Sequence, residues 1–173
     1  MVAAARRYEP HGDTYATLLG LLAATGLRIS EALSLRVDDL TRDGLHVRET
    51  KCHKSRLVPL HPSVERELTG FLERRSSARC DRVFVGPQGG PLQYERVKLV
   101  YRKVLATIGI DHKQTPRPRL HCLRHTFAVR VLEASDSTAV AEHQLALTTY
   151  LGHATIASTY WYLEATPQLL ASI

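Results

Sequence analysis

Two tyrosines near the C-terminus carry phenol groups that could act as nucleophiles. Tyr160 and Tyr162 flank Trp161, the single tryptophan of the chain, in the stretch TYWYLEAT. A phenol can act as a nucleophile, but its pKa of about 10 leaves only about a thousandth of it ionised at neutral pH. It therefore needs a base or a cationic pocket. On a helix the two side chains would point about 200° apart, so only one of them can face a given cleft.

Cations and imidazoles that could serve such a phenol lie upstream. In HCLRH, His121 and Arg124 are three residues apart and would share one face of a helix. In TGLRISEAL, Arg28 follows a glycine that is typical of a helix end. Its planar guanidinium can bind backbone carbonyls, pair with an acid such as Glu31, or grip a phosphate.

Two further motifs carry a lysine and a histidine. Lys51 lies in KCHKSR between two strand-like runs, with Lys54 and Arg56 nearby. This pattern is typical of a solvated basic turn, and it also allows a lysine to reach an anionic substrate. His153 follows a glycine in LGHAT, where a histidine usually caps or packs a helix, and it precedes Tyr162 by nine residues.

The order of these motifs is more specific than any one of them. ATGLRISEALSLRVDDL, KCHKSRLVPLHP, HCLRHTFA and YLGHATIASTYWY follow one another between about residues 14 and 165. In this order they resemble the tyrosine recombinase, or phage integrase, family. The resemblance implies that Arg28 and Arg124 bind the scissile phosphate and that Lys51 is the lysine of the hairpin. It also implies that His121 and His153 complete the phosphate pocket and that Tyr162 is the nucleophile. Glu31 matches a supporting acidic position.

The implied chemistry suits these residue types. Attack by Tyr162 on a DNA phosphodiester places extra charge on the non-bridging oxygens, which permanently protonated arginines can stabilise. His121 can accept the phenol proton, and Lys51 can protonate the departing 5′-oxygen. The arginines take the place that a metal has in many nucleases. We therefore expect no metal and no cofactor, and the three scattered cysteines form no zinc motif.

The leading hypothesis is that the protein is a site-specific recombinase, which cuts and rejoins DNA through a 3′-phosphotyrosyl intermediate. The alternatives are a type IB topoisomerase-like enzyme and a catalytically silent DNA-binding remnant of a mobile element. The expected partners are double-stranded DNA and other recombinase protomers in a tetrameric synapse. The resemblance also implies that the tail TPQLLASI docks on a neighbouring protomer.

Composition agrees with a protein that binds a polyanion. The chain has 173 residues, 44% of them hydrophobic, which is enough for one domain with a real core. The net charge of +6 favours nucleic acid as the partner. The sequence has neither the run of about 18 apolar residues that a membrane span needs nor a secretory leader pattern. We expect a cytoplasmic, nucleoid-associated protein with no membrane contact.

Helices dominate the predicted elements. Residues 14–26, 28–40, 62–77, 94–110, 120–134 and 137–152 have helical patterns, with Ser30 as an N-cap, and two short helices follow to residue 173. Residues 44–50 and 55–61 form a predicted β-hairpin, and RVFVG at 82–86 a short strand before the turn GPQGG. These elements predict a mainly α, α+β fold with a small antiparallel sheet at its edge. We expect residues 1–173 to be one catalytic domain, without the N-terminal DNA-clamping domain that the family usually carries.

Overall fold

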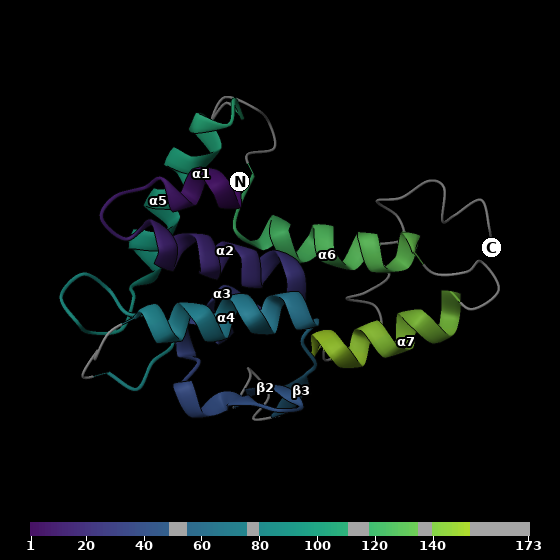
Figure 1. The fold of residues 1–173 in the computed structure, drawn as a ribbon. Coiled ribbons are helices and arrows are strands. Elements are labelled where there is room, and N and C mark those ends of the chain that lie inside the picture. The colour runs from purple at the N-terminus through teal and green to yellow at the C-terminus, as the bar shows by residue number, and fades with distance from the viewer. Residues whose placement is uncertain (49–54, 76–79, 111–117, 135–139, 153–173) are drawn as a thin grey trace.

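The fold is taken from a computed structural model of the chain (Figure 1), which describes residues 1–48, 55–75, 80–110, 118–134 and 140–152. Most of the elements in these ranges are helices. In chain order the elements are α1 (Val2–Arg6), α2 (Gly12–Thr25), α3 (Ile29–Ser34), the 3-10 helix η1 (Val37–Asp39), β1 (Leu40–Thr41), β2 (Gly44–Val47), β3 (Arg56–Val58), α4 (Pro62–Arg74), α5 (Tyr94–Thr107), α6 (His121–Glu133) and α7 (Val140–Leu151).

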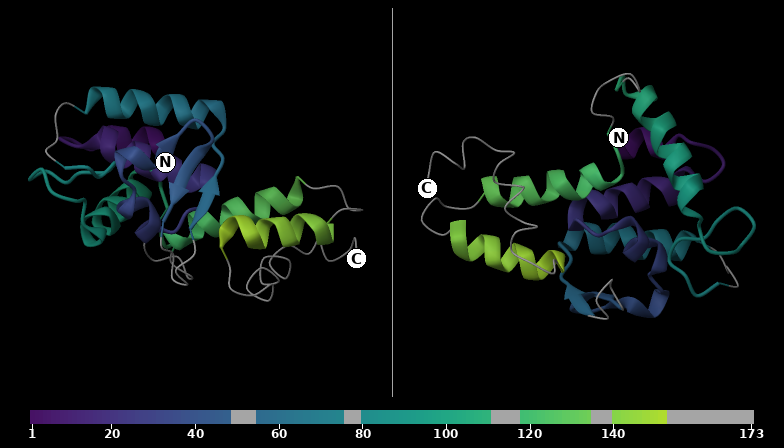
Figure 2. Two further views of the ribbon diagram at one scale, coloured as in Figure 1. Left: turned by 90° about the horizontal axis from the view of Figure 1, so that it is seen from below. Right: turned by 180° about the vertical axis from the view of Figure 1, so that it is seen from behind.

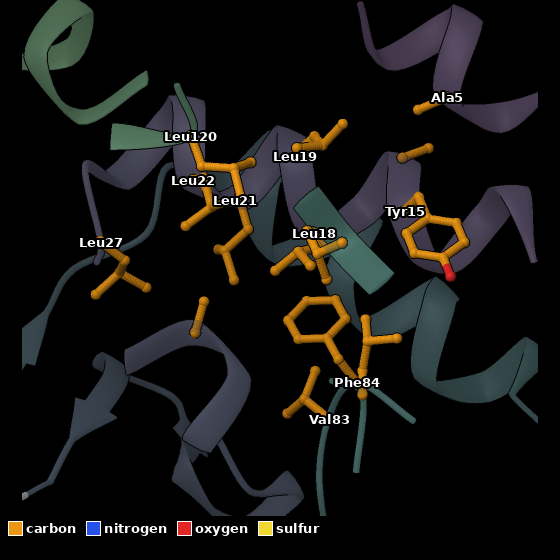
Figure 3. Packing of buried hydrophobic residues seen from close by; sticks show 14 of the residues in the cluster. Ala5, Tyr15, Leu18, Leu19, Leu21, Leu22, Leu27, Val83, Phe84 and Leu120 are labelled. Carbon is orange, nitrogen blue, oxygen red and sulfur yellow. The ribbon is translucent and has the colours of Figure 1, made fainter. Parts of the chain in front are cut away.

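Helix α2 is the centre of the main hydrophobic core. It is apolar on most of its circumference, which is typical of a helix that is covered on several sides, and α1, α4 and α6 all pack against it. Figure 3 shows Leu18 close to Phe84, and Leu22 beneath Leu120, so segments far apart in sequence meet on α2. Phe84 also stacks on Phe71 of α4, with ring centroids 5.8 Å apart. The core thus joins both halves of the chain.

The predicted end of the first long helix is confirmed. Gly26 has φ 62°, in the left-handed region, and its N–H donates to the Leu22 carbonyl. A Cβ at Gly26 would lie 2.5 Å from Cδ1 of Phe127 on α6. The glycine therefore ends α2 and also lets α6 approach closely.

The prediction for residues 28–40 is wrong in two respects. The N-cap is Arg28 rather than Ser30, because the Glu31 carboxylate accepts the Arg28 backbone N–H at 2.9 Å. The helix also stops at Ser34 instead of continuing to residue 40. The Asp39 carboxylate accepts the Arg36 backbone N–H at 2.9 Å, and this contact starts the separate 3-10 turn η1.

The predicted hairpin is confirmed, and it belongs to a three-stranded antiparallel sheet in the order β1-β2-β3. The short strand β1 was not predicted. Leu45 pairs with Val58, and Val47 pairs with Arg56. Leu45, Val47 and Val58 are buried against the helices. The sheet is therefore fixed to the core by one apolar face, and the connection that carries Lys51 joins the paired ends of β2 and β3.

The predicted strand at 82–86 is wrong. This segment has only isolated bridges, from Arg82 to Arg36 and from Val85 to Pro91. Arg75, at the end of α4, donates to the carbonyls of Arg82 and Val83. A side chain thus takes carbonyl groups that a neighbouring strand would otherwise bind. The turn after it is confirmed, with the Gly86 N–H donating to the Gly90 carbonyl at 2.7 Å.

Helices α6 and α7 lie side by side and extend away from the rest of the helices (Figures 1 and 2). Both were predicted. A second, smaller apolar cluster holds them together, formed by Ala128, Leu132, Leu147 and Leu151. Phe127 of α6 stacks on Tyr150 of α7, with centroids 5.6 Å apart. This pairing brings the C-terminal end of α7 back toward α2 and α3.

None of the helices in the described ranges is long and apolar enough to cross a membrane. The predicted helices after residue 154 lie outside those ranges.

We expect Gly26→Ala to destabilise the fold more than Gly89→Ala. Both glycines have positive φ, 62° and 81°, so alanine at either position costs about 1 kcal/mol of backbone strain. Only Gly26 adds a clash, with Phe127, because a Cβ at Gly89 meets nothing within 4 Å. Overpacking adds about 1–3 kcal/mol. Denaturant unfolding of the two variants measures the difference, and equal losses would contradict the close approach of α6.

Candidate active site

The C-terminal end of α7 is bound by two arginines from distant parts of the chain. Arg124 Nη2 donates to the Leu151 carbonyl at 2.7 Å, and Arg28 Nη2 donates to the Gly152 carbonyl at 3.2 Å. The two carbonyls belong to consecutive residues. The structure therefore brings together the two arginines that the sequence analysis predicted as a pair, through a shared stretch of backbone.

Arg124 connects three helices. Its Nη1 donates to the Gly26 carbonyl at 2.8 Å, so one guanidinium, carried by α6, binds the ends of both α2 and α7. The residue is only 1% exposed. A buried charge is tolerated when it is well hydrogen-bonded, and here backbone carbonyls supply the bonds. In this structure Arg124 holds the ends of α2 and α7 together through these two carbonyls, and its predicted phosphate contact remains a prediction.

Arg28 is the more accessible arginine of the pair. Its side chain is 29% exposed, and Nη1 lies 2.8 Å from Glu31 Oε1. The helix α3 places these two groups one turn apart, and Glu31 binds the Arg28 backbone N–H as well. The structure therefore confirms the acid pairing and the carbonyl binding that the sequence allowed for Arg28. Both contacts fix the direction of its guanidinium.

His121 belongs to the same electrostatic site. It is the first residue of α6, and part of its surface stays open to solvent. Partial burial lowers its pKa, and the nearby charges of Arg124 and Arg28 lower it further, together with His125. The lowered pKa favours the neutral imidazole, which can accept a proton. The role of His121 as a base stays a prediction.

Arg56 is the residue of this region that sequence reasoning missed. The basic turn was expected to be solvated, but the Arg56 side chain is only 13% exposed and donates to both oxygens of Glu31. One signal could have found it. In a strand, residues two apart share a face, and Arg56 is two residues before the buried Val58.

Tyr150 lies close to the site but has the properties of a packing residue. Burial raises its pKa to about 12, although Arg56 and Arg124 act in the opposite direction. Its ring stacks on Phe127 in the second apolar cluster. A phenol with such a pKa is poorly suited to act as a nucleophile at neutral pH.

Three predicted site residues lie outside the described residues, namely Lys51, His153 and Tyr162. Their sequence neighbours are placed. Lys51 belongs to the connection between β2 and β3, and His153 directly follows Gly152, whose carbonyl binds Arg28. Over the described ranges, no three His, Cys, Asp or Glu side chains form a group that could hold a metal ion.

We expect Arg28→Met to raise the pKa of His121. The positive charge of Arg28 is one of the causes that lower this pKa, and methionine removes the charge while keeping most of the apolar stem. An NMR titration of the histidine ring protons measures the shift. Arg74→Met is the matched control, because Arg74 pairs with Asp13 on the surface. The same His121 pKa in both variants would show that the charge of Arg28 does not act on His121.

We expect Glu31→Gln to make the free energy of unfolding less dependent on pH at acidic pH. Burial alone would raise the pKa of Glu31, but hydrogen bonds from Arg56 and Arg28 hold it below its ordinary value of 4.5. As the pH falls, the unfolded chain is thus protonated first. The stabilisation from Glu31 is complete above about pH 4.5 and is lost as the pH falls through the folded-state pKa.

Denaturant unfolding between pH 7 and pH 3 measures this effect. The glutamine variant should be about 2 kcal/mol less stable at pH 7, because charged hydrogen bonds are lost, and its stability should fall less toward pH 3. Glu67→Gln, on the surface of α4, is the control. Parallel pH profiles for Glu31→Gln and the wild type would show that the Glu31 pKa is not lowered.

Comparisons with known proteins show the family of the chain. The model of the phage integrase family matches residues 1–168. The putative integrase/recombinase y4rE of Sinorhizobium fredii is 36% identical, over 99% of this chain and 58% of its own length. The tyrosine recombinase XerD of Corynebacterium glutamicum is 31% identical, over 90% and 50%. The chain thus spans about half the length of the curated relatives it matches.

Solved structures show the same fold. The XerA recombinase matches with a TM-score of 0.76 and 23% identity, covering 98% of this chain and 57% of the other. The XerH recombinase, in a post-cleavage complex with its palindromic difH substrate, matches with a TM-score of 0.73 and 22% identity over 98% of this chain and 48% of the other. Because the family model covers nearly the whole sequence, the chain belongs to the phage integrase family of tyrosine recombinases.

Proposed function

We propose that this chain is the catalytic domain of a site-specific DNA recombinase. In this proposal Tyr162 attacks a DNA phosphodiester, forms a 3′-phosphotyrosyl link and releases a 5′-hydroxyl. The 5′-hydroxyl of a partner strand then attacks the phosphotyrosyl link, which joins the two strands and frees Tyr162. The observation that carries the proposal is the meeting of Arg28 and Arg124 at the end of α7, with His121 under the influence of both charges. Family membership supports it independently.

The two arginines would stabilise the charge of the transition state. Arg28 is the more accessible, and its contacts described above use one N–H on each of two nitrogens, out of the five that a guanidinium carries. Arg124 would act from the buried side, with the orientation that its two carbonyl contacts define. Loss of one such donor typically costs about 10²–10³ in rate. Because both groups stay protonated, this stabilisation is independent of pH.

Proton transfers would be divided between His121 and Lys51. His121 is neutral at physiological pH and can accept the phenol proton. Lys51 would protonate the 5′-oxygen as it leaves, since an alkoxide leaves poorly without a proton. Its connection joins the two strands that lead into the site. His153, next to Gly152, would complete the phosphate pocket.

Basic side chains on α5 support double-stranded DNA as the substrate. Lys98 and Arg102 of α5 line one surface pocket together with apolar side chains and with Arg119, which lies two residues before His121. Such groups neutralise backbone phosphates and make binding salt-dependent. We further propose that several protomers act together on the DNA, as a tetrameric synapse. A lambda integrase fragment bound to a core site as a dimer has the same fold, with a TM-score of 0.71.

Covalent capture of DNA tests the proposal. We expect the wild-type chain to form an SDS-resistant adduct with nicked duplexes from a randomised pool, and Tyr162→Phe to form none while still binding the same DNA. Tyr160→Phe is the matched control and should keep capture, because the two phenols cannot face one cleft. Mass spectrometry of the captured peptide identifies the residue.

The outcomes separate the alternatives. Binding without any adduct would support a catalytically silent DNA-binding protein, and an adduct on Tyr160 or Tyr150 would reject Tyr162. If the wild type relaxes a supercoiled plasmid that carries the captured sequence but never joins it to a second duplex, the topoisomerase-like alternative replaces recombination.

Lys51→Ala is expected to slow cleavage of ordinary captured DNA far more than cleavage of the same DNA with a bridging 5′-sulfur. A thiolate leaves without protonation, so the general acid becomes dispensable. Single-turnover rates on the two substrates measure the ratio. Lys54→Ala is the matched control on the same connection. Equal defects of Lys51→Ala on both substrates would remove Lys51 from this role.

A further inference from the structure

We propose that Arg56 is a positioning residue that ties the hairpin of Lys51 to the two-arginine site. The inference rests on the proposed function, because it concerns the group that would protonate the leaving oxygen. Arg56 itself is mostly buried and touches Glu31 and the end of α7. It would act by holding the catalytic groups in register with one another.

The first link runs from β3 to α3. Arg56 Nη2 lies 2.8 Å from Glu31 Oε2, and Nη1 lies 3.1 Å from Oε1. The same carboxylate binds the Arg28 side chain at 2.8 Å and its backbone N–H at 2.9 Å. A movement of Arg56 would therefore change the carboxylate that directs the Arg28 guanidinium. One buried acid joins the hairpin to the accessible phosphate-binding arginine.

The second link runs from β3 to the end of α7. Gly152 has φ 65°, and a Cβ there would lie 3.1 Å from Nη1 of Arg56. The guanidinium thus packs directly against the backbone of Gly152, whose carbonyl accepts from Arg28. Arg56 therefore contacts the residue that precedes His153, as well as the acid that orients Arg28.

The two strands of the hairpin are anchored unequally. Before the connection, Arg48 binds the Asp39 carboxylate, which is 4% exposed, and lies 3.5 Å from Asp38, but the Arg48 side chain itself is 53% exposed. After the connection, Arg56 is 13% exposed and pairs with a carboxylate that is 6% exposed. Exposed ion pairs contribute little, whereas breaking a buried one costs much more. The start of β3 is therefore held by the less exposed of the two arginines, Arg56.

The geometry requires arginine rather than a cation in general. A planar guanidinium can donate to both carboxylate oxygens at once and still lie flat against backbone, whereas an ammonium is a point charge. Arg56→Lys therefore keeps the charge but loses the second hydrogen bond. Arg56→Met removes both. The pair of variants separates the effect of charge from the effect of shape.

Hydrogen exchange tests the anchoring without any catalytic activity. In the full chain, Arg56→Met should increase exchange of amides in β3 and at Gly152, while α4 and α5 exchange as in the wild type. Arg56→Lys should show a smaller increase at the same amides. Arg74→Met, which breaks a surface pair with Asp13 on α4, is the control. If β3 and Gly152 exchange equally in Arg56→Met and Arg74→Met, the anchoring role is overturned.

Single-turnover cleavage tests the link to Lys51. On duplexes captured by the wild type, Arg56→Met should slow cleavage of ordinary DNA by about ten- to a hundredfold, as expected for a misplaced catalytic group. The bridging 5′-sulfur substrate should be slowed less. Equal slowing of both substrates overturns the positioning of Lys51. If Lys51→Ala itself shows no sulfur effect, the proposed role of Lys51 has failed, and exchange alone then decides whether Arg56 anchors the hairpin.

Discussion

A single buried carboxylate between two arginines sets the geometry of the candidate site. Glu31 is held by Arg28 from its own helix and by Arg56 from the sheet, and its side chain is 6% exposed. Neither arginine could be placed so near the other without it, because like charges in a partly dry site repel strongly. The carboxylate neutralises one of the two cations, so the three groups keep one net positive charge. Arg28 is the more exposed of the two arginines.

The backbone at the end of α7 completes this arrangement. A helix ends with carbonyl groups that lack partners within the helix, and here Arg124 and Arg28 bind two of them in succession. The carbonyl ends of α2 and α7 both point toward Arg124, which explains how a nearly inaccessible charge is tolerated. The arginines therefore build the site as well as charge it. A substitution at either position should alter the meeting of α2, α6 and α7 along with any chemistry.

Much of the helical fold and part of the site could be predicted from the sequence because their signals are local. Helical periodicity and Gly26 located α2, and the spacing of His121 and Arg124 placed them on one face of α6. The failures have nonlocal or competing causes. Arg75 reaches the carbonyls of the 82–86 segment from another element, and the Glu31 carboxylate binds the Arg28 backbone N–H, so that Arg28 rather than Ser30 is the N-cap. Arg56 was missed because a charge beside a turn is usually solvated.

The same contacts explain why the site must be assembled from both halves of the chain. Arg28 lies before the sheet, Arg56 within it and Arg124 after it, yet all three bear on the short backbone stretch Leu151–Gly152. Helices α6 and α7 share only a small apolar cluster of their own. Against the main core they are held by Leu123 of α6 and Tyr150 of α7, by these charged contacts and by Phe127 beside Gly26. A shift of α7 would move both carbonyls at once, so the two arginines are coupled through α7 and cannot be oriented independently.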